Sequence, residues 1–209
     1  MSQALEAFKL AHDASNTALM LSNLARVARQ QAALPLPLGV EAAAAEVAVQ
    51  RSTPLQLYRE AQQLCRVAAD ALGRREAQSW VWNVVQMELA TCQLAEGLYR
   101  RQSAAMACVE DQVLAAMGVQ AQPPGEEGLS PAARNTATAV ELLTRALHTF
   151  QAVGNGAASQ LAVAHFHLGH ALSDAAEAEG DDAEAVAGRR HRSLKITLPV
   201  RALLSRLGV

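Results

Sequence analysis

Three clustered histidines, His165, His167 and His170, have the residue type that metal binding needs. On a helix, His167 and His170 occupy adjoining positions, whereas His165 points away from them. No Cys or Glu stands nearby at the helical spacing that would complete a ligand set, unlike in a His-Glu-x-x-His site. We therefore predict no metal site and assign these histidines to a helix face that packs against its neighbour.

The other candidates for chemistry are equally sparse. The paired carboxylates at 126–127 and 181–182 fall in polar loops, where solvated charge is a better interpretation than acid–base catalysis. The sequence has no glycine-rich phosphate loop and no nucleophile elbow. We expect the three cysteines, Cys65, Cys92 and Cys108, to be small hydrophobic residues of the core. Their odd number favours a reduced intracellular compartment. The prediction is a non-enzymatic protein without a cofactor.

Composition indicates which elements must position any site. The 209 residues are 51% hydrophobic but only 3% aromatic, and Ala and Leu dominate. These residues form helices well, and Ala-rich faces suit stacked helical hairpins. The net charge of −2 argues against affinity of the whole chain for nucleic acid. Because no apolar run approaches about 20 residues, we predict no membrane span.

A recurring pattern organises the predicted helices. The clearest unit is an antiparallel hairpin over residues 57–100, with Trp80 and Trp82 at the start of its second helix. A small-x3-large-x2-small pattern occurs at Ala4/Phe8/Ala11, Ala61/Cys65/Ala68 and Ala139/Leu143/Ala146. A large-then-small pair follows each, at Leu24-Ala25, Leu89-Ala90 and Leu168-Gly169. This arrangement resembles tetratricopeptide repeats, although the hairpins start 57 and 78 residues apart instead of about 34.

We therefore predict an all-α fold, an irregular tetratricopeptide-like array of helical hairpins that forms an α-solenoid. Its domain would span residues 1–177, with loop insertions near 34–53 and 118–131. Residues 178–209 would form an acidic linker and a basic C-terminal helix. Thr53-Pro54 and Ser130-Pro131 are expected helix starts, because each pairs a capping side chain with a proline. Residues 101–117 carry an expected apolar stripe, made of Ala105, Val109, Val113 and Ala116.

Residues 7–29 and 57–95 resemble consecutive parts of the C-terminal helical region of the erythroid differentiation-related factor family. The resemblance rests on Asp13, Asn16 and Asn23, and on a tract that includes Tyr58, Ala61, 68–72, Trp82 and Glu88-Leu89. It implies a tetratricopeptide-like repeat scaffold and not an enzyme. Animal members are linked to nuclear control of erythroid gene expression, so the resemblance favours a nuclear location, with a cytoplasmic location as the alternative. The long N-terminal region of that family is missing here, and we expect a fragment or truncated homologue.

The predicted function is protein–protein interaction, within a nuclear gene-regulatory factor. Helical phase predicts a groove that holds a segment of a partner protein, lined by Asn23, Arg26, Asn83, Gln86 and Gln93. The alternative is a regulatory factor that contacts nucleic acid through its basic tail. That tail carries candidate contacts or an import signal at Arg189, Arg190, Arg192 and Lys195. Its basic end could equally dock on the acidic stretch at 177–184.

Overall fold

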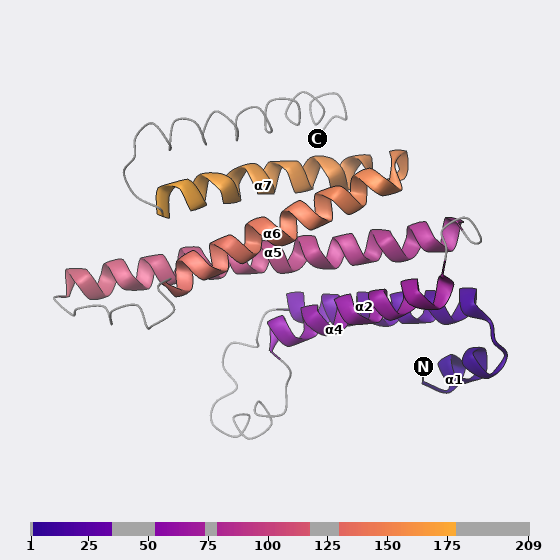
Figure 1. Cartoon of the computed structure of the whole chain (residues 1–209). Helices are drawn as coiled ribbons and strands as arrows, with labels where there is room; N and C mark the ends of the chain where they lie inside the picture. Colours follow the sequence, from indigo (N-terminus) through magenta and orange to yellow (C-terminus); the bar gives the residue numbers. More distant parts are fainter. Residues whose placement is uncertain (1, 35–52, 74–78, 118–129, 179–209) are drawn as a thin grey trace, which may run out of the picture. The chain divides into compact units, whose positions relative to one another are not determined.

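The computed structural model describes residues 2–34, 53–73, 79–117 and 130–178, which form helices and no strand (Figure 1). The all-α prediction is confirmed. The helices are α1 (Ser2–Leu10), α2 (Ala14–Ala33), α4 (Pro54–Leu72), α5 (Ser79–Ala116), α6 (Pro131–Val153) and α7 (Ala158–Ala178). They divide into two compact units, unit 1 over Met1–Gln93 and unit 2 over Leu94–Val209, so the boundary falls inside α5.

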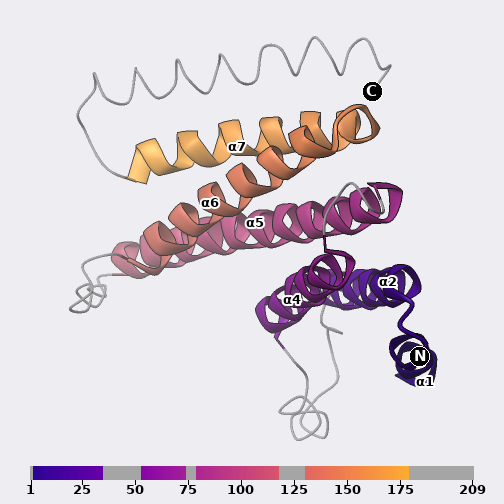
Figure 2. The ribbon, with the colours of Figure 1, turned by 45° about the vertical axis from the view of Figure 1, so that its right-hand side comes forward.

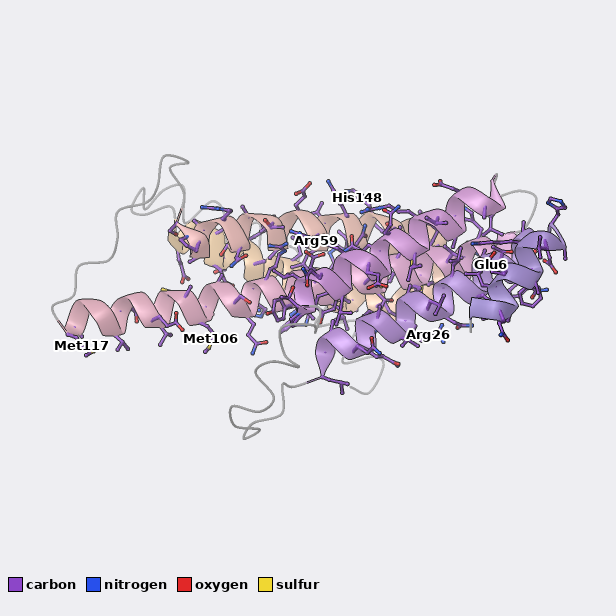
Figure 3. All side chains as sticks on the ribbon, turned by 90° about the horizontal axis from the view of Figure 1, so that it is seen from below. Glu6, Arg26, Arg59, Met106, Met117 and His148 are labelled. Carbon is purple, nitrogen blue, oxygen red and sulfur yellow. The ribbon has the colours of Figure 1, made fainter. Side chains whose placement is uncertain are left out.

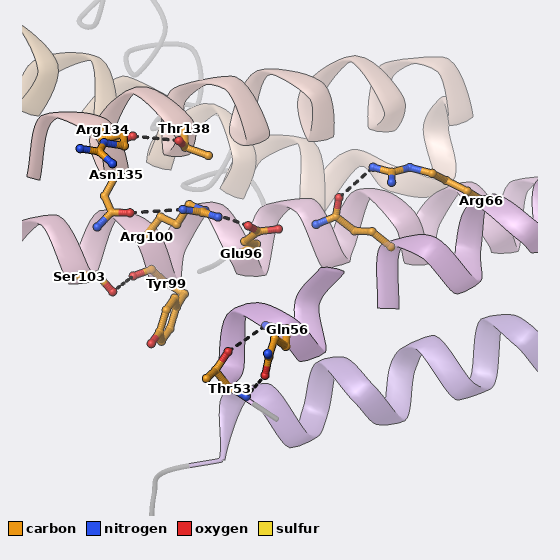
Figure 4. A network of polar contacts seen from close by, with 11 residues as sticks. Thr53, Gln56, Arg66, Glu96, Tyr99, Arg100, Ser103, Arg134, Asn135 and Thr138 are labelled. Carbon is orange, nitrogen blue, oxygen red and sulfur yellow. Dashed lines mark hydrogen bonds and ion pairs between the residues drawn. The ribbon is translucent and has the colours of Figure 1, made fainter. Parts of the chain in front are cut away.

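Local side chains set the helix starts, as the sequence predicts in two cases. Thr53 caps α4 by accepting a hydrogen bond from the Gln56 N–H, and the Gln56 side chain accepts one from the Thr53 N–H (Figure 4). Ser130 caps α6 in the same way, with proline at the first helical position. The third helix start is that of α2, at Ala14 directly after Asp13. Asp13 accepts a hydrogen bond from the backbone of Asn16, which lowers the pKa of its carboxyl.

In unit 1, α2 and α4 pack against each other and run antiparallel (Figures 1 and 2). The first part of α5 completes the core through Val81, Val85 and Cys92. Trp82 packs against this core, whereas Trp80 is exposed. The result is a three-helix core whose seam between α2 and α4 consists mostly of small side chains.

The same local sequence builds both sides of that seam. Leu24-Ala25-Arg26-Val27-Ala28 in α2 matches Leu64-Cys65-Arg66-Val67-Ala68 in α4, 40 residues later. Burial follows the match: the second and fifth residues of each run are buried, and the valines are exposed. The two helices therefore present equivalent faces to each other.

Unit 2 contains the rest of α5 with α6 and α7, and the last two form an antiparallel hairpin (Figures 1 and 2). Gly154, at φ +90°, ends α6, since this conformation suits glycine. Gly97 of α5 lies against Leu143 of α6: a Cβ at Gly97 would stand 3.0 Å from Leu143 Cγ. A glycine in the middle of α5 thus lets the buried Leu143 approach its backbone.

Several predictions need correction. Ala4 and Ala11 are exposed, so the first of the three recurring patterns forms no buried seam, whereas the other two do. Residues 101–116 continue α5, and their predicted apolar stripe is exposed at Val109 and Val113. The two predicted insertions and the 178–209 tail lie almost entirely outside the described residues. The single domain over 1–177 stays a prediction.

Candidate protein-interaction surfaces

An ion-pair cluster in unit 1 joins α2 to α5. Arg29 Nε lies 2.8 Å from Glu88 Oε1, and Arg26 Nε lies 3.3 Å from Glu88 Oε2. The Glu88 side chain is only 7% exposed, the Arg29 side chain 21% and the Arg26 side chain 47%. Two guanidinium groups thus share one carboxylate, and the cluster keeps one excess positive charge on its solvent side, at Arg26.

The charge of Glu88 also acts on its neighbours. Burial alone would lower the pKa of Arg29, but the hydrogen bond and charge of Glu88 outweigh it and raise the pKa above its usual value. The Cys92 thiol lies 3.8 Å from Glu88 Oε1. Hydrogen bonding with Cys65 and burial raise the pKa of Cys92 far above its ordinary range. Both thiols are buried, and the raised pKa keeps Cys92 protonated, which suits a core residue and not a nucleophile.

The predicted partner-binding residues lie in different environments. Asn23 is exposed on α2, one turn before the half-exposed Arg26. On α5, Asn83 and Gln86 are partly buried, and Asn83 Oδ1 has no hydrogen-bond partner among the described residues. Gln93 is only 6% exposed, and its Oε1 likewise lacks a partner there. A groove containing all five stays a prediction.

Unit 2 carries a cavity of about 730 Å³ between the end of α5, the start of α6 and the end of α7. Its apolar lining includes Leu98, Ala105 and Val109 of α5. Its polar rim includes Asp174 and Glu177 on the last turns of α7, and the Arg101 Nε lies 2.5 Å from Asp174 Oδ2. Its volume lies within the range of about 300–1,000 Å³ that is typical of ligand-binding cavities. We call it the unit 2 groove.

The exposed apolar face of α5 continues from this groove toward the helix end. It is formed by Met106, Val109, Val113 and Met117, which recur at helical spacing. Met106 is 59% exposed and Met117 72%. Figure 3 labels both, with Met117 at the end of α5 that extends past α6 and α7. Exposed large apolar residues in a continuous row are typical of an interaction surface.

Cys108 lies in the groove and is exposed, so its assignment to the core was wrong. Its Sγ accepts a 3.7 Å hydrogen bond from Gln112 one turn later. The other two cysteines are buried as predicted. A cysteine on an α-helix faces the core only if its turn is covered, and helical periodicity alone does not reveal that.

The three clustered histidines lie on α7. Phe166 stacks edge-on against His167 and His170, with ring centroids 5.2 and 4.5 Å away. Burial lowers the pKa of His165. Burial, and secondarily the charges of Arg101 and His170, lower the pKa of His167, which lines the groove. In the part of the chain that the structure describes, no group of three or more His, Cys, Asp or Glu could hold a metal ion.

Comparison with protein families gives a decisive match. The model of the erythroid differentiation-related factor 1-like TPR repeats matches residues 1–109, just over half of the chain. The chain belongs to this family. No curated protein and no solved structure matches it. The matched residues cover all of unit 1 and the beginning of unit 2.

Membership accounts for the repeated helical hairpins and indicates a protein–protein interaction scaffold. Helical repeat families of this kind are generally non-catalytic. None of the described helices combines the length and the apolar character that crossing a bilayer requires. The predicted contacts at Arg189, Arg190, Arg192 and Lys195 lie outside the described residues.

Two features of these surfaces were not predicted from the sequence. The pairing of Arg26 and Arg29 with Glu88 joins residues about 60 positions apart, and neither residue type nor spacing indicates it. The α2–α4 match was detectable, because Leu-x-Arg-Val-Ala occurs at 24–28 and again at 64–68. A comparison of the chain with itself at that spacing would have placed Arg26 and Arg66 at equivalent positions.

Proposed function

We propose that this protein is a non-catalytic scaffold that binds other proteins through its TPR-like helices, as part of a nuclear gene-regulatory factor. The nuclear role rests on the family alone. The observation that supports a binding surface is the Arg26–Arg29–Glu88 cluster in unit 1, where two arginines share one carboxylate. Its excess charge suits a partner segment that carries an acidic side chain.

The neighbouring polar residues support an extended peptide as the ligand. Asn23 lies one turn from Arg26 on α2, and Asn83 Oδ1 is a buried acceptor without a described partner. The exposed Asn23 amide can accept from and donate to a peptide backbone, so it would fix the backbone while Arg26 binds a carboxylate. Asn83 Oδ1 is covered in the unbound chain, and a buried acceptor without a partner is uncommon in native proteins.

The test is affinity purification of the tagged full chain, with mass spectrometry to identify its partners. The variant to compare is Arg26→Ala combined with Asn83→Ala. A charge reversal at Arg26 is unsuitable, because a new carboxylate beside the buried Glu88 would destabilise unit 1. We expect partner recovery to fall at least about tenfold, the loss of about 1.4 kcal/mol of binding free energy.

Arg66→Ala is the matched control, because Arg66 occupies on α4 the position that Arg26 occupies on α2. Arg66 donates a hydrogen bond to Gln62 within its own helix, 3.4 Å long. The control should retain its partners. Equal recovery from the double variant and the parent chain, with unchanged thermal unfolding, would show that the partner binds elsewhere.

A further inference from the structure

We propose that Trp80 is a second contact of the partner segment that binds Arg26, and that it packs against a large apolar side chain of that segment. This inference rests on the proposed function, since it concerns the same surface of unit 1. Trp80 is 64% exposed at the start of α5, although tryptophan is highly buried on average. Single exposed apolar residues are common, so the position of Trp80 carries the argument.

Helical phase places Trp80 on the side of α5 that borders α2. Successive residues of an α-helix are about 100° apart, so Glu88 lies about 80° around α5 from Trp80. The arginines of α2 bind Glu88. Cys92, which forms a hydrogen bond with Cys65 of α4, lies about 120° from Trp80 in the same direction. The order around α5 is therefore Trp80, then the contact with α2, then the contact with α4.

An apolar strip continues from Trp80 toward the ion-pair cluster. Val84 and Met87 follow Trp80 at i+4 and i+7, the spacing of one helix face, and both are partly buried. Trp80 and Glu88 are eight residues apart, which is about 12 Å along the helix axis. An extended peptide advances about 3.3 Å per residue, so about four residues of it span this distance.

The chemistry of the two contacts defines the class of partner. The Arg26 side chain is 47% exposed and carries the excess positive charge of the cluster, so it selects a carboxylate. The exposed indole of Trp80 selects a large apolar side chain, and tryptophan and arginine are enriched among the residues that dominate binding energies. The partner is therefore an extended protein segment with an acidic residue and a large apolar residue about four positions apart.

The experiment uses a random peptide library without tryptophan, displayed on phage and selected against the tagged full chain. We expect the enriched peptides to share an acidic residue and a large apolar residue about four positions apart. The Kd of a fluorescently labelled copy of the most enriched peptide is then measured by fluorescence anisotropy. Trp80→Ala should weaken binding at least about tenfold, whereas Trp80→Phe should largely retain it. Phe166→Ala is the matched control, because it removes a 41% exposed aromatic side chain from unit 2, and it should bind like the parent chain.

An unlabelled copy of the same peptide should also shield Trp80 of the parent chain from quenching by acrylamide. This measurement needs no variant, so it tests the contact even if Trp80→Ala unfolds. Absence of shielding, or enriched peptides without the shared spacing, would overturn the inference.

Arg26→Ala separates this inference from the proposed function. Loss of peptide binding in Arg26→Ala but not in Trp80→Ala would overturn the role of Trp80 and leave the proposed function intact. Equal binding by Arg26→Ala and the parent chain would overturn both, because the segment would then lack its acidic contact.

Discussion

The α2–α4 seam of unit 1 consists mainly of small side chains, whereas the α5–α6 contact of unit 2 places a large side chain against a glycine. In unit 1, Ala25, Ala28, Cys65 and Ala68 are all buried, and none contributes much apolar area. In unit 2, the fully buried Leu143 approaches Gly97. The first seam spreads its packing over many small contacts, and the second depends strongly on one position.

The two units also differ in how they treat charge and apolar surface. Unit 1 buries Glu88 between two arginines. In unit 2, the described residues leave a groove and an apolar face of α5 uncovered, and Arg101 pairs with Asp174 at the rim. Unit 1 thus covers its buried charge with arginines, whereas unit 2 has apolar surface that no described side chain covers.

Removing the charge of Glu88 should have the largest effect on this comparison. Glu88→Gln leaves Arg29 and Arg26 without their anion in a partly buried site, and we expect unfolding free energy to fall by about 2 kcal/mol. Urea denaturation of the full chain, followed by a probe in unit 1, measures it. Glu141→Gln is the control, because Glu141 and Arg145 form an exposed pair worth at most about 0.5 kcal/mol.

The close approach of Leu143 to Gly97 in unit 2 should give the next largest effect. In Gly97→Ala the new Cβ would lie 3.0 Å from Leu143 Cγ and 3.2 Å from Leu143 Cδ2. Overpacking costs about 1–3 kcal/mol, and the better helix propensity of alanine offsets about 1 kcal/mol of it. We expect a net loss of about 1 kcal/mol in urea denaturation. Gly156→Ala, whose new Cβ would lie in open space, is the control and should be neutral. A stabilising effect of Gly97→Ala would contradict the tight packing of Leu143 against Gly97.

Acidification should produce the smallest effect and should act on unit 2. Burial lowers the pKa of His165 and His167 in the folded chain, so the unfolded chain binds more protons just below the ordinary histidine pKa of about 6.5. Stability is therefore full above that pH and falls as the pH drops through it. Urea midpoints at pH 7.5 and 5.5 measure the loss.

Replacing both partly buried histidines, by His165→Gln with His167→Gln, should reduce this pH-dependent loss. His148→Gln is the control, since His148 is exposed on α6 (Figure 3). An identical pH response in the parent chain and the double variant would contradict the assignment of the effect to α7.

Sequence patterns predicted the helix type and several boundaries because these depend on neighbours along the chain. Thr53-Pro54 and Ser130-Pro131 start helices through contacts within four residues. The periodicity at Val109 and Val113 correctly identified an apolar face, but whether a face is covered depends on distant elements. The Glu88 cluster could not be predicted for the same reason. Membership of the family was recognisable because it rests on the sequence itself.

The Arg29–Glu88 pair distinguishes α2 from α4, two helices with similar packing faces. The seam residues of α2 and α4 are nearly interchangeable, as the matched runs at 24–28 and 64–68 indicate. At the next residue the helices diverge, since α2 has Arg29 where α4 has Ala69. Only α2 can therefore satisfy Glu88 from that position. The buried ion pair therefore favours α2 over the similar α4 as the helix that packs beside Glu88. This selectivity comes with the desolvation penalty of burying the two charges.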